Sequence, residues 1–184
     1  DRVDPLLGGD DALVELTRAA HGKGMRVVGD VTLNHCGSGH DWFRAALADP
    51  DAPERELFYF DESLPNGYES WLGIRSLPKL DWSSAELRRR MAGVVRKWLE
   101  PPYELDGWRV DVANMVGRFR DLALTAAVAT AARAAVESAR ADGLLIAEHG
   151  HDFRFDLAGD GWHGTMNYAG FLRPVYTWLR GEEL

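Results

Sequence analysis

Apolar positions recur along the chain with the periods of helices and of short buried strands. Residues 10–21 place apolar side chains at the spacing of one helix face, and two glycines follow them. The run MRVVGDV, residues 25–31, is rich in β-branched residues and is typical of a parallel strand that is buried on both faces. Residues 36–82 are polar and aromatic and too long for a plain connection, so the sequence predicts a functional loop there.

The second half of the chain continues the alternation of helices and strands. The capping box Ser83-Ser84-Ala85-Glu86 predicts the start of a helix, which Pro101 and Pro102 end. The expected apolar face of this helix comprises Leu87, Met91, Val94 or Val95, and Trp98. Further strands are predicted over residues 107–112, 144–149 and 163–168, and further helices over residues 118–141 and 171–179. This order is typical of an α/β fold with a parallel sheet.

Composition narrows the function classes. The 184 residues include 21 Lys and Arg against 29 Asp and Glu, a net charge of −8, which argues against binding to nucleic acid. No apolar run reaches the roughly 18 residues of a membrane-spanning helix. The single Cys36 excludes an intrachain disulfide framework. One cysteine and no visible signal segment favour a cytoplasmic location, although the sequence leaves the compartment open.

Charged side chains gather where three predicted strands end: Asp30, Arg109, Asp111 and Glu148. Because the carboxyl ends of parallel strands meet at one rim of the sheet, these groups are expected to lie close together. A single acid in such a place is usually a helix cap or a surface ion pair, but three successive strands favour a site. The pattern predicts a carboxylate pair, with Asp111 as nucleophile, Glu148 as proton donor and Arg109 keeping Asp111 ionised.

Four segments resemble conserved motifs of the α-amylase family, glycoside hydrolase family 13. DVTLNH (residues 30–35) resembles the first motif, LPKLD (77–81) the fifth, GWRVDVANM (107–115) the second and LLIAEH (144–149) the third. The fifth motif lies between the first and the second, as it does in the family. One such motif is weak support, but four in the right order are a strong signal that covers almost the whole chain.

The resemblance implies a partial TIM (β/α)₈ barrel, in which residues 1–184 carry the third to sixth strands and residues 36–82 form a short insertion similar to domain B. A complete barrel typically needs about 250 residues. The start DRVDP resembles the segment just after the family's second strand, so the natural N-terminus is expected upstream. An open sheet exposes its edges and apolar surface, so the chain is expected to self-associate.

The same resemblance implies a retaining glycosidase that hydrolyses α-glucosidic bonds in starch-derived oligosaccharides or related α-glucans. Asp111 corresponds to the nucleophile and Glu148 to the general acid and base, while Arg109 fixes Asp111. The two acids need different charge states, so we expect Asp111 to be ionised and Glu148 to be neutral in a less polar setting. No candidate for the family's third acid follows Glu148 at the required distance, so the chain alone is expected to be inactive.

Five residues are candidates for binding the α-glucan or maltooligosaccharide substrate. The resemblance implies that His35 hydrogen-bonds the sugar, while Asp30 and Asn34 organise the loop behind it. Tyr68 and Trp71, in the segment YESWLGIRS, are candidates for stacking on sugar rings. This segment is similar to that of neopullulanase, cyclomaltodextrinase and maltogenic-amylase members of the family.

The LPKLD segment bears on metal binding. Calcium-dependent members of the family usually carry an acid where Lys79 stands, and a cation does not ligate calcium. The segment is closer to the MPKLN of neopullulanase-type members. No cofactor and no metal are therefore expected.

Two other functions remain open alternatives. His149 and His151 form an H-x-H pattern, which together with Asp30 and His35 would suit zinc in a metal-dependent hydrolase. The HD pair that begins at His151 lies too close to Glu148 to be the family's fourth motif. The second alternative is a non-catalytic interaction subunit similar to α-amylase, which the presence of both acids argues against.

Overall fold

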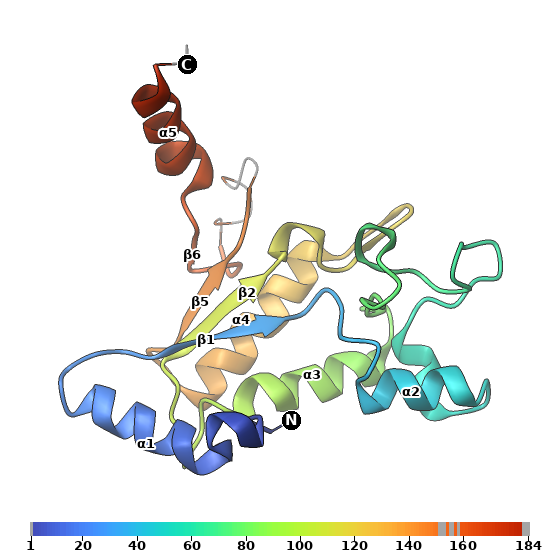
Figure 1. Ribbon diagram of the computed structural model, residues 1–184, viewed down its shortest axis with the longest axis horizontal. Coiled ribbons are helices and arrows are strands. Elements are labelled where there is room, and N and C mark those ends of the chain that lie inside the picture. Colours follow the sequence, from blue (N-terminus) through green and yellow to red (C-terminus); the bar gives the residue numbers. More distant parts are fainter. Residues whose placement is uncertain (1, 151–153, 155–156, 158, 182–184) are drawn as a thin grey trace.

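A four-stranded parallel sheet forms the centre of the computed structural model, which describes residues 2–150, 154, 157 and 159–181 (Figure 1). The strands lie in the order β1 (Val28–Thr32), β2 (Gly107–Asp111), β5 (Leu144–Ala147) and β6 (Gly164–Thr165). Every pairing between neighbouring strands is parallel. The predicted α/β fold with a parallel sheet is confirmed.

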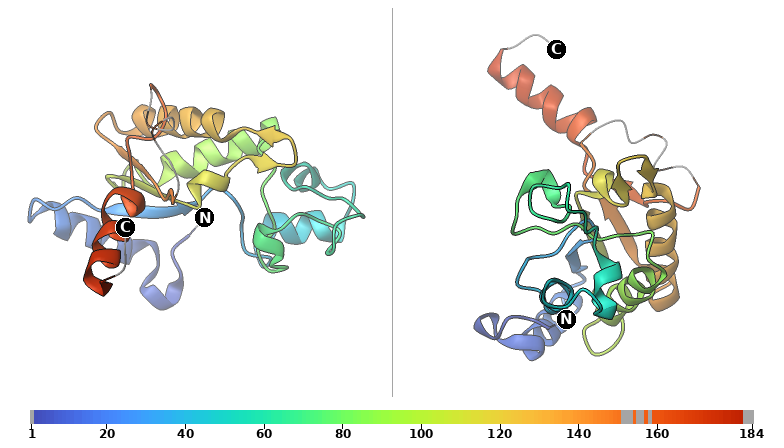
Figure 2. Two further views of the ribbon diagram at one scale, coloured as in Figure 1. Left: turned by 90° about the horizontal axis from the view of Figure 1, so that it is seen from above. Right: turned by 90° about the vertical axis from the view of Figure 1, so that its right-hand side faces the viewer.

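Helices connect these strands. Helices α3 (Ala85–Lys97) and α4 (Thr125–Ala139) pack against each other on one face of the sheet, and α1 (Gly9–His21) precedes β1 (Figure 2). After β6 the chain forms a π-helical segment, Tyr168–Leu172, and then α5 (Arg173–Arg180), which projects away from the sheet (Figure 1). Short 3₁₀ helices lie at Pro5–Leu7 and Ala113–Met115.

The two faces of the sheet differ in chemistry because side chains alternate along each strand. Val31 of β1, Val110 of β2 and Ala147 of β5 lie in one row of the register, and all three are buried on the face covered by the helices. The neighbouring row points to the other face and contains Asp30 and Arg109. The sheet therefore separates an apolar core from a polar face.

Trp108 fastens β2 to the helix layer. Its indole N–H donates to the carbonyl oxygen of Val95 on α3 at 3.0 Å, and the side chain is buried. The ring also lies over Gly29 of β1, where a Cβ atom would come within 2.6 Å of the indole. Glycine at position 29 is therefore what allows the large ring to fill the space between sheet and helix.

The insertion, residues 36–82, is folded around an aromatic core. It contains α2 (Asp41–Ala48) and the 3₁₀ helices Pro53–Leu57 and Trp71–Gly73, and antiparallel bridges link its outgoing and returning segments. Phe43 is 1% exposed and contacts Phe58 and Tyr68 edge to face, with ring centroids 5.0 and 4.8 Å away. These contacts give the insertion a packed interior of its own.

Several predicted boundaries were wrong. The strand predicted over residues 25–31 begins at Val28 and is buried on one face only, because the polar face of the sheet is open. The helix predicted over residues 118–141 begins at Thr125, because Gly117 at φ +66° leads into a hairpin of β3 (Arg118–Phe119) and β4 (Leu122–Ala123).

The start of α3 is also one residue from the predicted cap. The Ser84 hydroxyl, and not that of Ser83, accepts the Leu87 N–H at 3.1 Å. Ser83 instead binds Asp81, and Glu86 pairs with arginines of its own helix. The apolar face of α3 is otherwise as predicted, and of the two candidate valines Val95 is the buried one. None of the helices in the described part of the chain combines the length and apolarity that a membrane crossing needs.

A buried carboxylate joins the elements at the end of the sheet where the strands begin. Asp106 is 1% exposed, and its Oδ2 accepts the Val27 N–H at 2.6 Å and lies 2.8 Å from Nε2 of His21. Its Oδ1 lies 2.7 Å from Nη2 of Arg140, just after α4. Asp106 thus ties the end of α1 and the entry to β1 to the exit of α4.

Replacing Asp106 by Asn should lower the free energy of unfolding by about 2–4 kcal/mol at pH 7, because Arg140 loses its buried partner. Burial raises the pKa of Asp106, but the Val27 N–H, His21 and Arg140 outweigh it and hold the pKa below its ordinary value. The carboxylate's contribution is then present above the unfolded-state pKa and lost as the pH falls through the folded-state pKa. The cost of Asp106→Asn should therefore shrink in urea titrations at about pH 3.

Asp142→Asn is the matched control, because Asp142 also contacts Arg140 but is 60% exposed. It should cost about 1 kcal/mol or less. Equal costs for the two variants at pH 7 would contradict the role given to Asp106.

Candidate active site

Arg109 lies at the centre of the charged groups on the polar face. It is the middle residue of β2, opposite Asp30 of β1 in the register, and Asp111 lies two residues further along the same strand. Alternation therefore places Arg109 and Asp111 on the same side of the sheet, as the sequence predicts. Glu148 follows the last residue of β5, the next strand across the sheet.

The Arg109 guanidinium contacts all three acids. Its Nη1 lies 2.6 Å from Oδ2 of Asp30 and 2.9 Å from Oδ1 of Asp111, and its Nη2 lies 3.1 Å from Oε1 of Glu148. The pKa of Arg109 is lowered by burial, but its hydrogen bonds to Asp111 and Asp30 outweigh this effect and raise it. One cation thus contacts carboxylates from three neighbouring strands. Asp30, predicted at a strand end, is the middle residue of β1, because this strand continues to Thr32.

Glu148 lies in a polar setting. Its Oε2 accepts the backbone N–H of Val112 at 2.9 Å, and the hydroxyl of Tyr168 lies 3.4 Å from its Oε1. The side chains of Glu148 and Asp111 are both 27% exposed. The less polar setting expected for Glu148 in the intact enzyme is not present in this chain, because Arg109 reaches both acids and the polar face is open.

His35 lies beside this cluster on the segment that leaves β1. Its ring stacks on Trp71 with centroids 5.1 Å apart and an interplanar angle of 8°. Its Nδ1 lies 3.2 Å from Nδ2 of Asn34, which is fully buried. Burial lowers the pKa of His35, and the charges of Asp111 and Lys79 act in opposite directions on it. His35 is thus held in a fixed ring plane within range of the Asp111 charge.

Lys79, expected only to exclude calcium, is a buried cation of the site. Its Nζ donates to Oδ1 of Asn34 at 2.5 Å and to the carbonyl oxygen of Met115 at 2.9 Å. Burial lowers the pKa of Lys79 to about 8, although Glu69 raises it. Lys79 thereby connects the returning segment of the insertion to the residues that follow β1 and β2.

The structure brings together most of the predicted site residues, but not Tyr68. Tyr68 is 6% exposed, its hydroxyl donates to the carbonyl oxygen of Arg75, and its ring belongs to the aromatic core of the insertion. It therefore offers no free face to a sugar. Trp71 is half-buried, with one face on His35.

Sequence reasoning missed Tyr168 and Met166. Met166 Sδ lies 3.4 Å from Nε of Arg109, and Tyr168 approaches Glu148. Both residues follow β6. The rule that polar groups collect at strand ends would have found Tyr168 if it had been applied to this short strand, but Met166 is apolar and gives no such signal.

The metal-dependent alternative gains no support from the described residues. Among them, no three His, Cys, Asp or Glu side chains gather as a metal ion would require. His149 is 3% exposed, and His151 lies outside the described residues.

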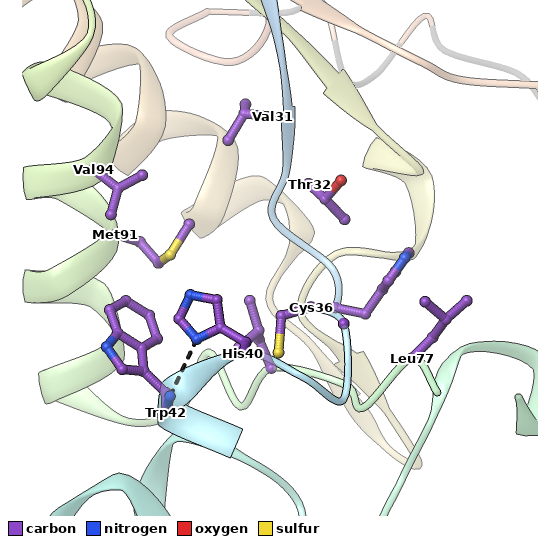
Figure 3. A pocket seen from close by; sticks show the side chains of 11 residues that line it. Val31, Thr32, Cys36, His40, Trp42, Leu77, Met91 and Val94 are labelled. Carbon is purple, nitrogen blue, oxygen red and sulfur yellow. Dashed lines mark hydrogen bonds between the residues drawn. The ribbon is translucent and has the colours of Figure 1, made fainter. Parts of the chain in front are cut away.

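A pocket of about 390 Å³ adjoins the site between β1, α3 and the start of α2 (Figure 3). His40 begins α2 by accepting the Trp42 N–H, and Met91 lines the pocket from α3. Burial raises the pKa of the Cys36 thiol, which also lines the pocket, to about 12. The pocket includes His35 but neither Asp111 nor Glu148, so the acids lie on an open face beside it.

Comparisons with known proteins agree with this geometry. The family model of the alpha amylase catalytic domain matches residues 1–154. The chain is 30% identical over 175 residues to a cyclomaltodextrinase from Geobacillus thermopakistaniensis and to neopullulanase 2 from Thermoactinomyces vulgaris, covering 90% of this chain and 28% of each relative. The type III pullulan hydrolase from Thermococcus kodakarensis has a TM-score of 0.83 at 29% identity, covering 95% of this chain and 30% of that one. The chain thus spans less than a third of these relatives.

Replacing Arg109 by Met should leave the three carboxylates facing one another without their shared cation. The expected loss is about 1–3 kcal/mol of unfolding free energy at pH 7, between the values for exposed and buried ion pairs. The loss should shrink at about pH 3, where carboxyl groups are largely protonated. Urea unfolding at both pH values measures it.

Arg133→Met is the matched control, because the Arg133 side chain is equally exposed, at 25%, but within the described part of the chain it forms an ion pair with one carboxylate, that of Glu137. It should cost less at pH 7. A cost for Arg109→Met that is no larger than the control, or that grows in acid, would contradict the electrostatic account.

Proposed function

Because the chain belongs to the α-amylase family through its catalytic domain, we propose that it is part of a retaining glycosidase that acts on α-glucosidic bonds. The observation that carries this proposal is the contact of one guanidinium, that of Arg109, with Asp111 and Glu148 at neighbouring strand ends. A retaining double displacement uses two carboxyl groups about 5–5.5 Å apart on either side of the scissile bond. The shared contact with Arg109 brings the two acids close to each other, which supports this proposal.

In the proposed mechanism, Asp111 attacks the anomeric carbon and forms a covalent glycosyl-enzyme. Glu148 protonates the leaving oxygen and, in the second step, removes a proton from the water that releases the sugar. Arg109 holds both carboxyl groups in place. His35, beside Asp111, would donate a hydrogen bond to a sugar hydroxyl.

The proposed substrates are starch-derived oligosaccharides and related α-glucans. The matched relatives are named as a cyclomaltodextrinase, a neopullulanase and a pullulan hydrolase, which are names of α-glucan hydrolases. The Lys79 segment and the segment YESWLGIRS support the neopullulanase-like branch within this class. We propose no cofactor, because a buried ammonium group occupies the position of the acid that calcium-dependent members use.

Within the barrel, we propose that β1, β2, β5 and β6 correspond to the third to sixth strands of the eight. The open polar face of the sheet would then be the barrel interior. Apolar side chains of α5, among them Trp178 and Leu179, are about 70% exposed, and we propose that second copies of the chain cover such surfaces in solution. Light scattering of the purified chain checks this, and a monomer would exclude it.

The full-length enzyme should release the α-anomer first, because two displacements at the anomeric carbon restore its configuration. Proton NMR of the first product formed from a maltooligosaccharide decides this, and an initial β-anomer would refute the mechanism. Glu148→Gln should lower kcat by about 10²–10⁴-fold, the usual contribution of a general acid.

The roles of Glu148 as acid and of Asp111 as nucleophile can be separated with an aryl α-glucoside whose phenol is acidic. Such a phenol leaves as its anion, so the first step needs no proton from Glu148. With this substrate, Glu148→Gln should regain the rate of the first displacement. Asp111→Asn should stay inactive with both the aryl α-glucoside and the maltooligosaccharide. Thermal melts of both variants should lie close to the native one, and recovery of Asp111→Asn would exclude it as the nucleophile.

The 184-residue chain alone should be inactive. Both acids are already 27% exposed, and catalysis needs groups that a surrounding shell holds within a fraction of an ångström. The assay is release of an aryl leaving group at high protein concentration, with Asp111→Asn as the control, because that variant should stay inactive with either substrate. Turnover above this control would show that a second chain completes the site.

A further inference from the structure

A buried ammonium group lies directly behind His35. Lys79 is 4% exposed. Among the described residues, its Nζ donates to the side-chain oxygen of Asn34, at 2.5 Å, and to the carbonyl oxygen of Met115, at 2.9 Å. Both are acceptors, which an ammonium group requires because it has three donors and no acceptor.

The ammonium group determines which way the Asn34 amide faces. If the amide were reversed, its NH₂ group would point at Nζ, and two donors would meet in a site from which water is excluded. The oxygen of Asn34 must therefore face Lys79. Its nitrogen then faces Nδ1 of His35, at 3.2 Å.

The amide orientation in turn determines where His35 carries its proton. An amide nitrogen only donates, so Nδ1 of His35 must accept. A neutral imidazole that accepts at one nitrogen carries its hydrogen on the other. The stacking of the ring on Trp71, at an interplanar angle of 8°, keeps Nδ1 in place for this contact.

We propose that Lys79 is a positioning residue, which fixes neutral His35 as the Nε2–H tautomer through the amide of Asn34. Neither Lys79 nor Asn34 needs to contact the substrate for this effect. His35 would then present a hydrogen-bond donor to the site, which suits a sugar hydroxyl oxygen. Only this last step rests on the function proposed above.

The tautomer can be read directly from the ¹⁵N-labelled chain. Long-range ¹H–¹⁵N correlation spectra at pH 7 distinguish the two ring nitrogens, because an unprotonated imidazole nitrogen resonates far downfield of a protonated one. The His35 signals are assigned by their loss in His35→Gln. The expected result is an unprotonated Nδ1 and a protonated Nε2, and a protonated Nδ1 in the native chain would overturn the proposal.

Three variants test whether Lys79 acts on His35 through the Asn34 amide. Asn34→Asp keeps an oxygen for Lys79 but removes the N–H donor, so the Nδ1 resonance should move upfield to the protonated range. Lys79→Met frees the amide to reverse, so the two nitrogen shifts should move toward each other. Lys79→Arg retains a cation with donors only, and it should restore the native pattern.

Lys23→Met is the matched control, because Lys23 is an exposed lysine after α1. The His35 signals of this variant should match those of the native chain. Unchanged His35 signals in folded Lys79→Met would overturn the proposal. If Lys79→Met fails to fold, Asn34→Asp decides instead: an Nδ1 of His35 that stays unprotonated in that variant would overturn the proposal. The spectra measure the protonation of the His35 ring and not enzyme activity. If the proposed glycosidase function were wrong, the result on the tautomer would therefore still hold.

Discussion

The register of the parallel strands is the constraint on which the rest of the structure depends. It sets Arg109 opposite Asp30 and, through the alternation of side chains, on the same face as Asp111. A slip of one residue would turn Arg109 into the helix-covered face and expose Val110, which is now fully buried. The burial of apolar side chains on one face therefore fixes the positions of the charged groups on the other.

The site is built jointly by the sheet and the insertion. The sheet contributes the acids and Arg109, while the insertion returns beside His35 through the backbone bridge to Lys79. The aromatic core around Phe43 gives the insertion a packed interior that supports this segment. A side chain on a packed support keeps its position better than one on a plain loop.

The sequence allowed the parallel sheet and the charged strand ends to be predicted because both depend on local patterns. β-Branched runs mark the strands, and the acids stand at fixed places in them. Helix α2 escaped prediction because it has only eight residues and is capped by His40, an unusual cap. The buried position of Tyr68 and the double contact of Arg109 could not be predicted, because both depend on how distant segments fold over one another.

The buried carboxylate at the base of the sheet also bears on how the chain folds during its synthesis. Asp106 joins residues that are 79 and 85 positions away in sequence, and its partner Arg140 lies further along the chain. While the chain is being made, α1 and β1 leave the ribosome long before these partners exist. Contacts of such long sequence separation form slowly, and incomplete sheets with open edges aggregate. Helix α1 and strand β1 can therefore complete their contacts with Asp106 and Arg140 only after residue 140 has emerged.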